Sequence, residues 1–321
     1  MKTYPDEHSD PESIHRARFL RLGAAMAAQL AIAPLHAQGA APAAQPRMHT
    51  RAIPSSGEQL GVIGCGTWQA FDVGSAEEDR KRLADVLRVL FDAGGSVVDS
   101  SPMYGRSEAV TGDLLTQLGM HDRAFVATKV WTRGVAEGVR QMEESMRLLQ
   151  HKRIELMQIH NLVDWRAHLK TLRGWMEAGR IKYLGITHYT ESAFGELEAI
   201  MRAEKLDFVQ LNYSLADRAA EARLLPLAAE RGIAVLVNRP FGGGGLLRGL
   251  SERLLPSWAA DIGCANWPQV LLKYVVSHPA VTCAIPGTSK PQHMRDNVAA
   301  SMGVMPDAAM RRRMAEEWRG R

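Results

Sequence analysis

The sequence predicts an α/β fold, a (β/α)8 barrel, for most of the 321-residue chain. Short apolar runs alternate eight times with longer segments, and no break in composition divides them into two doubly wound domains. The apolar runs are nearly continuous, as expected for parallel strands that are covered on both faces. The eight predicted strands are residues 62–65, 96–98, 124–128, 154–159, 181–187, 208–211, 234–237 and 281–284.

Three segments between these strands predict helices most clearly. They place apolar residues at helical spacing on one face and span residues 80–91, 135–149 and 165–176. Ahead of the first strand, residues 50–54 and 59–63 flank the string S-S-G-E and predict a β-hairpin. The barrel, with this hairpin at its start, is therefore expected to occupy residues 51–321.

Residues 1–37 have the pattern of a secretory signal peptide. Arg16, Arg18 and Arg21 precede an apolar run at 22–35, and the small residue Ala37 follows at a suitable cleavage point. The run is shorter than the ~18 residues of a membrane-spanning helix, so no stable membrane span is expected. Residues 38–50, which begin with a stretch rich in Ala, Gln and Pro, are predicted to be a linker.

The signal-like segment predicts export to the periplasm. The string R-A-R-F-L-R resembles a twin-arginine export signal, although Ala17 stands where the second arginine of the pair belongs. The alternative is an amphipathic or disordered leader on a cytoplasmic protein.

The composition argues against a nucleic-acid partner and against a metal site. The net charge is only +4, and the basic triplet near the end, at 311–313, is predicted to be a solvated helix face. Cys65, Cys264 and Cys283 show neither metal-ligand spacing nor an even disulfide framework. No feature of the sequence predicts an oligomeric state.

Polar residues end three successive predicted strands. Asp99 follows the second strand, Lys129 the third and His160 the fourth, while Tyr104 lies in the loop after Asp99. Catalytic residues of a barrel gather at the carboxyl ends of its strands, so these side chains are expected to meet. A lysine ammonium favours the phenolate and is expected to lower the pKa of Tyr104, while Asp99 holds Lys129 in place. His160 is expected to bind a carbonyl oxygen or to share a proton with Tyr104.

This group suits protonation of an oxygen on which negative charge develops, as in carbonyl reduction. No side chain donates hydride, so that reaction requires a nicotinamide or flavin. A Schiff-base aldolase that uses Lys129 on the same barrel is an alternative from another class.

The motifs resemble those of the aldo-keto reductase family over residues 51–297. The family's D-x-x-x-x-Y-G reads Asp99 to Gly105 here, Lys129 stands in a T-K strand end, and His160 follows the fourth strand. The resemblance implies reduction of an aldehyde or ketone to an alcohol, with NADPH as the cofactor (NADH possible) and Tyr104 as the proton donor. The alternative that the resemblance leaves open is a nicotinamide-binding partner subunit that senses redox state with little turnover.

The resemblance also implies the residues that bind the nicotinamide half of the cofactor. Thr187, His188 and Gln210 take the places that hold the carboxamide, with His188 where asparagine is usual. Asn238 stands where an aromatic residue usually stacks on the nicotinamide, and Arg239 is suited to grip the pyrophosphate. The further residues implied are Gly66, Thr67, Trp68, Pro240, Phe241 and Gly242.

The segment I-P-G-T-S-K-P-Q-H-M-R-D-N resembles the family's adenosine-phosphate site. Thr288 and Lys290 are implied to bind a 2′-phosphate, and Asp296 and Asn297 to hold the adenine, with Gly287 beside them. His293 stands where an arginine is often found. The glycine run at 242–245 does not give G-x-G-x-x-G in any register, so a Rossmann site is not expected.

Large apolar residues in or near the predicted loops are expected to form the substrate mouth. The small-molecule carbonyl substrate would then have a hydrophobic body. These residues are Trp68, Phe71, Met103, Trp131 and Trp165. The alternative for each of them is that it packs within its own loop.

Overall fold

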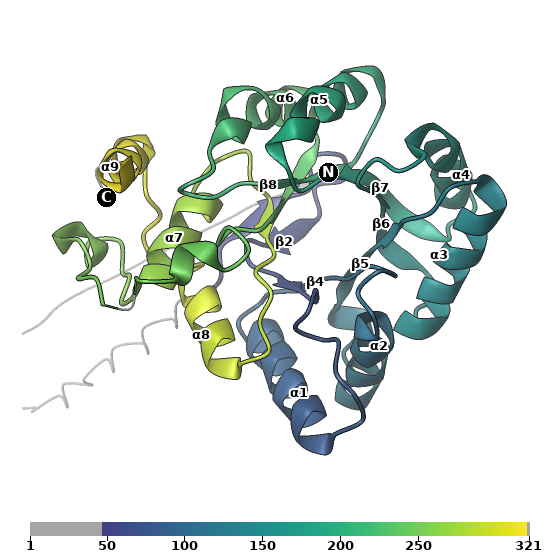
Figure 1. Cartoon of the computed structure of the whole chain (residues 1–321), viewed down its shortest axis with the longest axis horizontal. Helices are drawn as coiled ribbons and strands as arrows, with labels where there is room; N and C mark the ends of the chain where they lie inside the picture. The colour runs from purple at the N-terminus through teal and green to yellow at the C-terminus, as the bar shows by residue number, and fades with distance from the viewer. Residues whose placement is uncertain (1–46, 251, 320–321) are drawn as a thin grey trace, which may run out of the picture. The chain divides into compact units, whose positions relative to one another are not determined.

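Eight parallel strands form a ring in the computed structural model, which describes residues 47–250 and 252–319 (Figure 1). Each strand pairs in parallel with the next, and the bridges Ile63↔Ala284 and Gly66↔Gly287 join the first strand to the last. The strands are β3 (Cys65–Gly66), β4 (Val97–Asp99), β5 (Phe125–Val130), β6 (Ile154–His160), β7 (Ile181–Thr187), β8 (Phe208–Asn212), β9 (Ala234–Asn238) and β10 (Cys283–Ala284). The predicted (β/α)8 barrel is confirmed, whereas the predicted signal peptide and residues 38–46 of the linker lie outside the described residues.

Helices surround this ring of strands, as Figure 1 shows. They are α1 (Glu77–Asp92), α2 (Ser107–Leu118), α3 (Val135–Leu149), α4 (Trp165–Glu177), α5 (Phe194–Ala203), α6 (Leu224–Arg231), α7 (Trp267–Val276), α8 (Pro291–Ala299) and α9 (Ala308–Arg319). Local chemistry sets several ends: α2 and α6 stop at Gly119 and Gly232, both left-handed, and the side chain of Asn266 caps α7 by accepting from the Gln269 amide. None of the described helices is long and apolar enough to cross a membrane.

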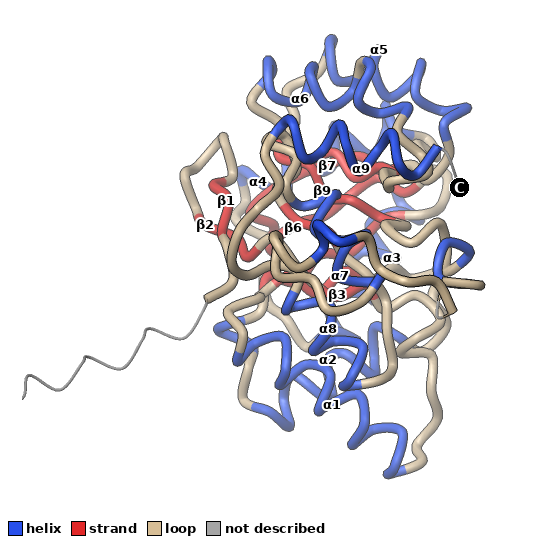
Figure 2. Tube along the Cα trace, turned by 90° about the vertical axis from the view of Figure 1, so that its left-hand side faces the viewer, coloured by secondary structure: helices blue, strands red, loops and turns tan. Residues whose placement is uncertain are grey.

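A β-hairpin covers the end of the barrel where the strands begin. It pairs β1 (Thr50–Ala52) with β2 (Gln59–Gly61), as predicted, and Figure 2 shows it at the left beside the strands. Its Ile53 and Leu60 pack in one buried cluster with inward-facing residues such as Phe125 and Phe208. Apolar side chains therefore close this end of the barrel.

The terminal helix α9 departs from the sequence prediction at one residue. Arg311 was expected on a solvated face, but its side chain is only 11% exposed and its Nη2 lies 2.9 Å from Glu221 Oε1. The same guanidinium donates to the Tyr213 hydroxyl and the Ser277 hydroxyl. Arg312 and Arg313 are exposed, so the prediction is wrong for Arg311 alone, because that side chain anchors α9 to the barrel.

Candidate active site

A cavity of about 630 Å³ opens where the barrel strands end. Its walls come from the loops after successive strands, which is where a barrel builds its site. The sequence predicts four functional residues at this end from their strand and loop positions. Three of them, Asp99, Tyr104 and His160, line the cavity. Other predicted residues that line it are Gly66, Thr67, Trp68, Met103, Trp131, Thr187, Gln210, Asn238, Arg239, Pro240, Phe241 and Gly287.

Lys129 lies beneath the cavity in a buried ion pair with Asp99. Its Nζ is 2.6 Å from Asp99 Oδ1 and 2.6 Å from the Ser100 carbonyl oxygen, and its side chain is 0% exposed. Burial lowers the pKa of Lys129, but Asp99 and Tyr104 outweigh it, so the pKa is raised above its usual value. A charged, inaccessible lysine is not a Schiff-base nucleophile, so the geometry disfavours the aldolase alternative.

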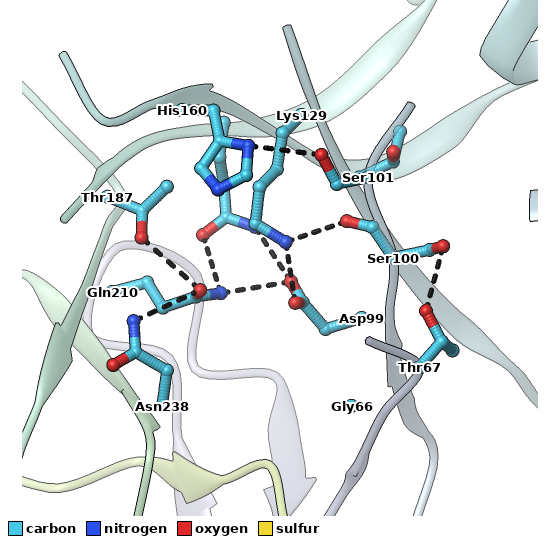
Figure 3. Close-up of polar contacts among 12 residues, drawn as sticks. Gly66, Thr67, Asp99, Ser100, Ser101, Lys129, His160, Thr187, Gln210 and Asn238 are labelled. Carbon is cyan, nitrogen blue, oxygen red and sulfur yellow. Dashed lines mark hydrogen bonds and ion pairs between the residues drawn. The ribbon is translucent and has the colours of Figure 1, made fainter. Parts of the chain in front are cut away.

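Two glutamine amides hold the second oxygen of Asp99. Gln210 Nε2 lies 2.9 Å from Asp99 Oδ2 (Figure 3). Gln158 Nε2 lies 3.0 Å from the same oxygen, and Gln210 also donates to Gln158 Oε1 at 3.2 Å. The sequence reading missed Gln158. The sequence does offer a sign of its role: Gln158 is a polar residue inside an apolar strand. It stands two positions before His160 and therefore points to the same face of the strand.

Gln210 contacts protein groups at every position of its amide. Its oxygen accepts from Thr187 Oγ1 at 3.2 Å and from Asn238 Nδ2 at 3.4 Å, while its nitrogen serves Asp99 and Gln158. Gln210, which is expected to hold the nicotinamide carboxamide, lines the cavity and links β8 to the ion pair. The expected carboxamide residue His188 turns its ring onto Tyr189, with centroids 5.5 Å apart, and does not line the cavity.

Tyr104 presents a protonated phenol beside the lysine charge. Lys129 Nζ lies 5.2 Å from the centre of the tyrosine ring. Burial raises the pKa of Tyr104 more than Lys129 lowers it, so the pKa is raised above its ordinary value. The lysine acts in the expected direction, but the expected net lowering is wrong because the side chain is largely desolvated. Tyr104 therefore holds its proton at neutral pH.

His160 is a neutral imidazole at the cavity wall. Burial, then the charges of Lys129 and His188, lower its pKa to about 2. Its Nδ1 lies 3.0 Å from Ser101 Oγ, and its ring meets the Tyr104 ring edge-on at 6.0 Å. Two donors, the phenol and the imidazole, thus lie side by side at one end of the cavity.

The low pKa of His160 predicts a loss of stability in acid. The unfolded chain binds a proton at His160 near pH 6.5, whereas the folded chain does so only near pH 2. This stabilisation is present above pH 6.5 and is lost as the pH falls, by about 2 kcal/mol at pH 5. Urea unfolding of the wild type and of His160→Gln at pH 7 and pH 5 measures it. Between pH 7 and pH 5, His160→Gln should lose about 2 kcal/mol less unfolding free energy than the wild type. Equal losses in the two proteins would contradict a low pKa for His160.

The loop after β9 places an exposed cation at the cavity. Arg239 adopts a left-handed backbone with φ 50°, and Gly242, Gly243 and Gly244 follow with φ of 59°, 66° and 88°. The amides of Gly242 and Gly244 donate to the Arg239 and Phe241 carbonyl oxygens inside the loop, so the exposed Arg239 side chain, which lines the cavity, is the group that suits an anion. Asn238 Oδ1 is buried and has no hydrogen-bond partner among the described residues, so the wall holds an acceptor that a ligand amide would satisfy. The residues present therefore fit a pyridine dinucleotide.

The predicted adenosine residues lie beyond the cavity lining, from the loop after β10 into α8. Thr288 Oγ1 accepts from the Lys290 amide at 3.1 Å, and the Lys290 side chain is exposed. Asp296 Oδ1 accepts from Asn266 at 2.8 Å and from Gln269 at 3.1 Å, and Asn297 is buried. Of these groups, the Lys290 ammonium is therefore the one free to meet an added phosphate.

The aromatic mouth is smaller than the sequence predicted. Trp68, Met103 and Trp131 line the cavity and are 53%, 40% and 41% exposed. Phe71 is wrong as a mouth residue: its amide donates to the Thr67 carbonyl, and the loop curls so that the ring is 0% exposed in the core. Trp165 is also wrong, because it packs against the core and lies outside the lining. The exposed Tyr189 lines the cavity and was missed.

The sequence and the fold agree with one family of known proteins. The model of the aldo/keto reductase family matches residues 62–313. The chain belongs to this family. As an aldo/keto reductase it is an NAD(P)-dependent oxidoreductase. The resemblance inferred from the tetrad of Asp99, Tyr104, Lys129 and His160 is confirmed. No group of three His, Cys, Asp or Glu side chains that could hold a metal occurs within residues 47–250 and 252–319.

Several relatives are similar over most of the chain. Methylglyoxal reductase YeaE of Escherichia coli (strain K12) is 27% identical over 260 residues, which cover 78% of this chain and 89% of that protein. The NADH-specific methylglyoxal reductase of the same organism is 26% identical over 319 residues, covering 80% and 95%. A crystal structure of an aldo/keto reductase from Klebsiella pneumoniae in complex with NADP and acetate superposes with a TM-score of 0.70 at 24% identity, covering 82% and 93%.

Proposed function

We propose that this aldo/keto reductase reduces an aldehyde or ketone to an alcohol with NADPH, and that Tyr104 supplies the proton. The observation that carries the proposal is the group at the end of the cavity. It combines a protonated phenol, an ion-paired lysine and a neutral histidine, with Lys129 Nζ 2.6 Å from Asp99 and 5.2 Å from the Tyr104 ring centre.

Each residue has a distinct role in this reaction. Tyr104 donates its proton to the carbonyl oxygen as negative charge develops there. Lys129 stabilises the phenolate that remains, and Asp99 keeps Lys129 charged and in place. His160 adds a hydrogen bond to the same oxygen. When bound, NADPH supplies the hydride, and Trp68, Met103 and Trp131 offer an apolar surface to the body of the substrate.

The choice of cofactor rests on the loop after β9, on Lys290 and on the relatives. The crystal structure of the Klebsiella pneumoniae relative contains NADP, while one Escherichia coli relative is named an NADH-specific reductase. Lys290 is exposed and belongs to the segment that resembles the family's 2′-phosphate site. NADPH is therefore the favoured cofactor, with NADH as a weaker one.

Replacing Lys290 with alanine tests this preference. We expect Lys290→Ala to weaken NADPH binding about 10-fold and to leave NADH binding unchanged, because a charge-assisted contact with the 2′-phosphate is lost. Quenching of tryptophan fluorescence gives both dissociation constants. Arg295→Ala is the matched control, because Arg295 is an exposed cation on α8, the helix that starts directly after Lys290. Equal weakening of both cofactors would remove Lys290 from the 2′-phosphate site.

Turnover tests the proposed activity directly. Purified protein with NADPH should reduce methylglyoxal or benzaldehyde, and the rate should depend on Tyr104. Tight NADPH binding with no turnover above the Tyr104→Phe background would instead favour a redox-sensing partner subunit.

We also propose that residues 1–37 direct export to the periplasm, from the basic and apolar pattern of that segment. Since reduced nicotinamide is scarce there, folded export with bound cofactor would suit a reductase. A fusion of residues 1–40 to a folded reporter should appear outside the cytoplasm, and a reporter retained inside would reject the proposal.

A further inference from the structure

The two serines that follow β4 make different contacts. Ser100 and Ser101 are both fully buried. The Ser100 hydroxyl accepts a hydrogen bond from Thr67 Oγ1 at 2.9 Å, whereas Ser101 Oγ lies 3.0 Å from His160 Nδ1 (Figure 3). A hydroxyl two residues beyond Asp99, in the segment after β4, therefore contacts the His160 ring.

The Ser101 hydroxyl has one available acceptor. Within the described part of the chain, His160 Nδ1 is its sole hydrogen-bond partner. A buried O–H group that finds no acceptor is costly, and a ring nitrogen accepts only when it carries no proton. The hydroxyl hydrogen therefore points at a bare Nδ1, and this arrangement is favoured by about 10-fold over a protonated Nδ1 that leaves the serine hydrogen unpaired.

A bare Nδ1 determines the state of the rest of the ring. His160 is 6% exposed, and the charge of the Lys129 ammonium opposes a second positive charge on the ring. The imidazole is thus neutral and carries its single proton on Nε2. His160 lines the cavity beside Tyr104, and no described residue accepts a hydrogen bond from its Nε2.

We infer that Ser101 is a positioning residue that fixes His160 as the Nε2–H tautomer, so that the imidazole donates a hydrogen bond to the substrate oxygen. With the other tautomer, a lone pair on Nε2 would face that oxygen and repel the charge developing on it. The catalytic consequence rests on the proposed carbonyl reduction, whereas the tautomer does not.

Nitrogen-15 NMR of the histidine rings tests the tautomer without substrate or cofactor. Protein labelled at both ring nitrogens is compared with His160→Gln to assign the resonances. The wild type should show an unprotonated, hydrogen-bonded Nδ1 and a protonated Nε2 at pH 7. A protonated Nδ1 in the wild type would overturn the inference outright.

Substitutions then test the part played by Ser101. In Ser101→Ala the Nδ1 resonance should shift, and the difference between the two nitrogens should shrink as both tautomers become populated. Ser101→Thr, which keeps a hydroxyl, should restore the wild-type pattern. Ser100→Ala, the adjacent buried serine, should leave the His160 resonances unchanged. Unchanged resonances in Ser101→Ala would overturn the role of Ser101.

The kinetic readout follows from the same variants. Ser101→Ala should lower kcat/KM for aldehyde reduction about 10-fold, the size of one hydrogen bond, with NADPH affinity unchanged. If the wild type reduces no carbonyl compound, the proposed function fails while the NMR result stands. If it does reduce one and Ser101→Ala matches it despite a mixed tautomer, the catalytic consequence is overturned.

Discussion

Tyr104→Phe is expected to lower kcat/KM for aldehyde reduction by about 10³-fold, within the usual range for loss of a general acid. The phenol is the one acidic O–H group of the tetrad that lines the cavity, and its raised pKa keeps it protonated at neutral pH. Phenylalanine preserves the ring beside Lys129 and His160, so the loss isolates the proton. Steady-state kinetics with NADPH and benzaldehyde measures it.

Tyr183→Phe is the matched control for that substitution. Its hydroxyl lies at the opposite end of the barrel, where it bonds to Ser56 at 2.7 Å and Glu58 at 2.6 Å. The Tyr183→Phe protein should lose some stability and keep its reductase activity. A Tyr104→Phe protein that retains more than about a tenth of the activity would identify another proton donor.

Lys129→Met is expected to affect both activity and stability. Removing one partner of a buried pair leaves Asp99 uncompensated, which costs about 3–5 kcal/mol of unfolding free energy. Activity should fall by about 10²- to 10⁴-fold, because the charge that supports the phenolate is lost. Urea unfolding and steady-state kinetics give the two values.

The double variant Lys129→Met with Asp99→Asn separates these two effects. Removing the carboxylate charge relieves the unpaired charge, so part of the lost stability should return while activity stays low. In the wild type Gln158 and Gln210 donate to Asp99, and the oxygen of an asparagine at this position can still accept from both. A double variant that is no more stable than Lys129→Met would show that the ion pair is not the source of the loss.

The sequence was sufficient to predict the barrel and the tetrad for a physical reason. Asp99, Lys129 and His160 end successive strands, and parallel strands bring their carboxyl ends together whatever the loops do. Tyr104 joins them because only a short loop separates it from Asp99.

Other residues depended on contacts that spacing does not encode. Phe71 and Trp131 are both loop aromatics in sequence, yet only a turn at Thr67 determines that Phe71 folds into the core. Arg311 belongs to a basic triplet, but Glu221 on a distant segment draws it inward. The net pKa of Tyr104 was misjudged because the extent of its burial follows from packing.

Transfer of deuterium tests the central claim most directly. Purified protein is mixed with NADPH that carries deuterium at both positions of C4, together with benzaldehyde, and the product is analysed by mass spectrometry. We predict benzyl alcohol with one deuterium on the former carbonyl carbon, one alcohol for each NADPH oxidised, and almost none with Tyr104→Phe. NADPH oxidation without labelled alcohol, or equal product from Tyr104→Phe, would contradict the assignment of this cavity to carbonyl reduction.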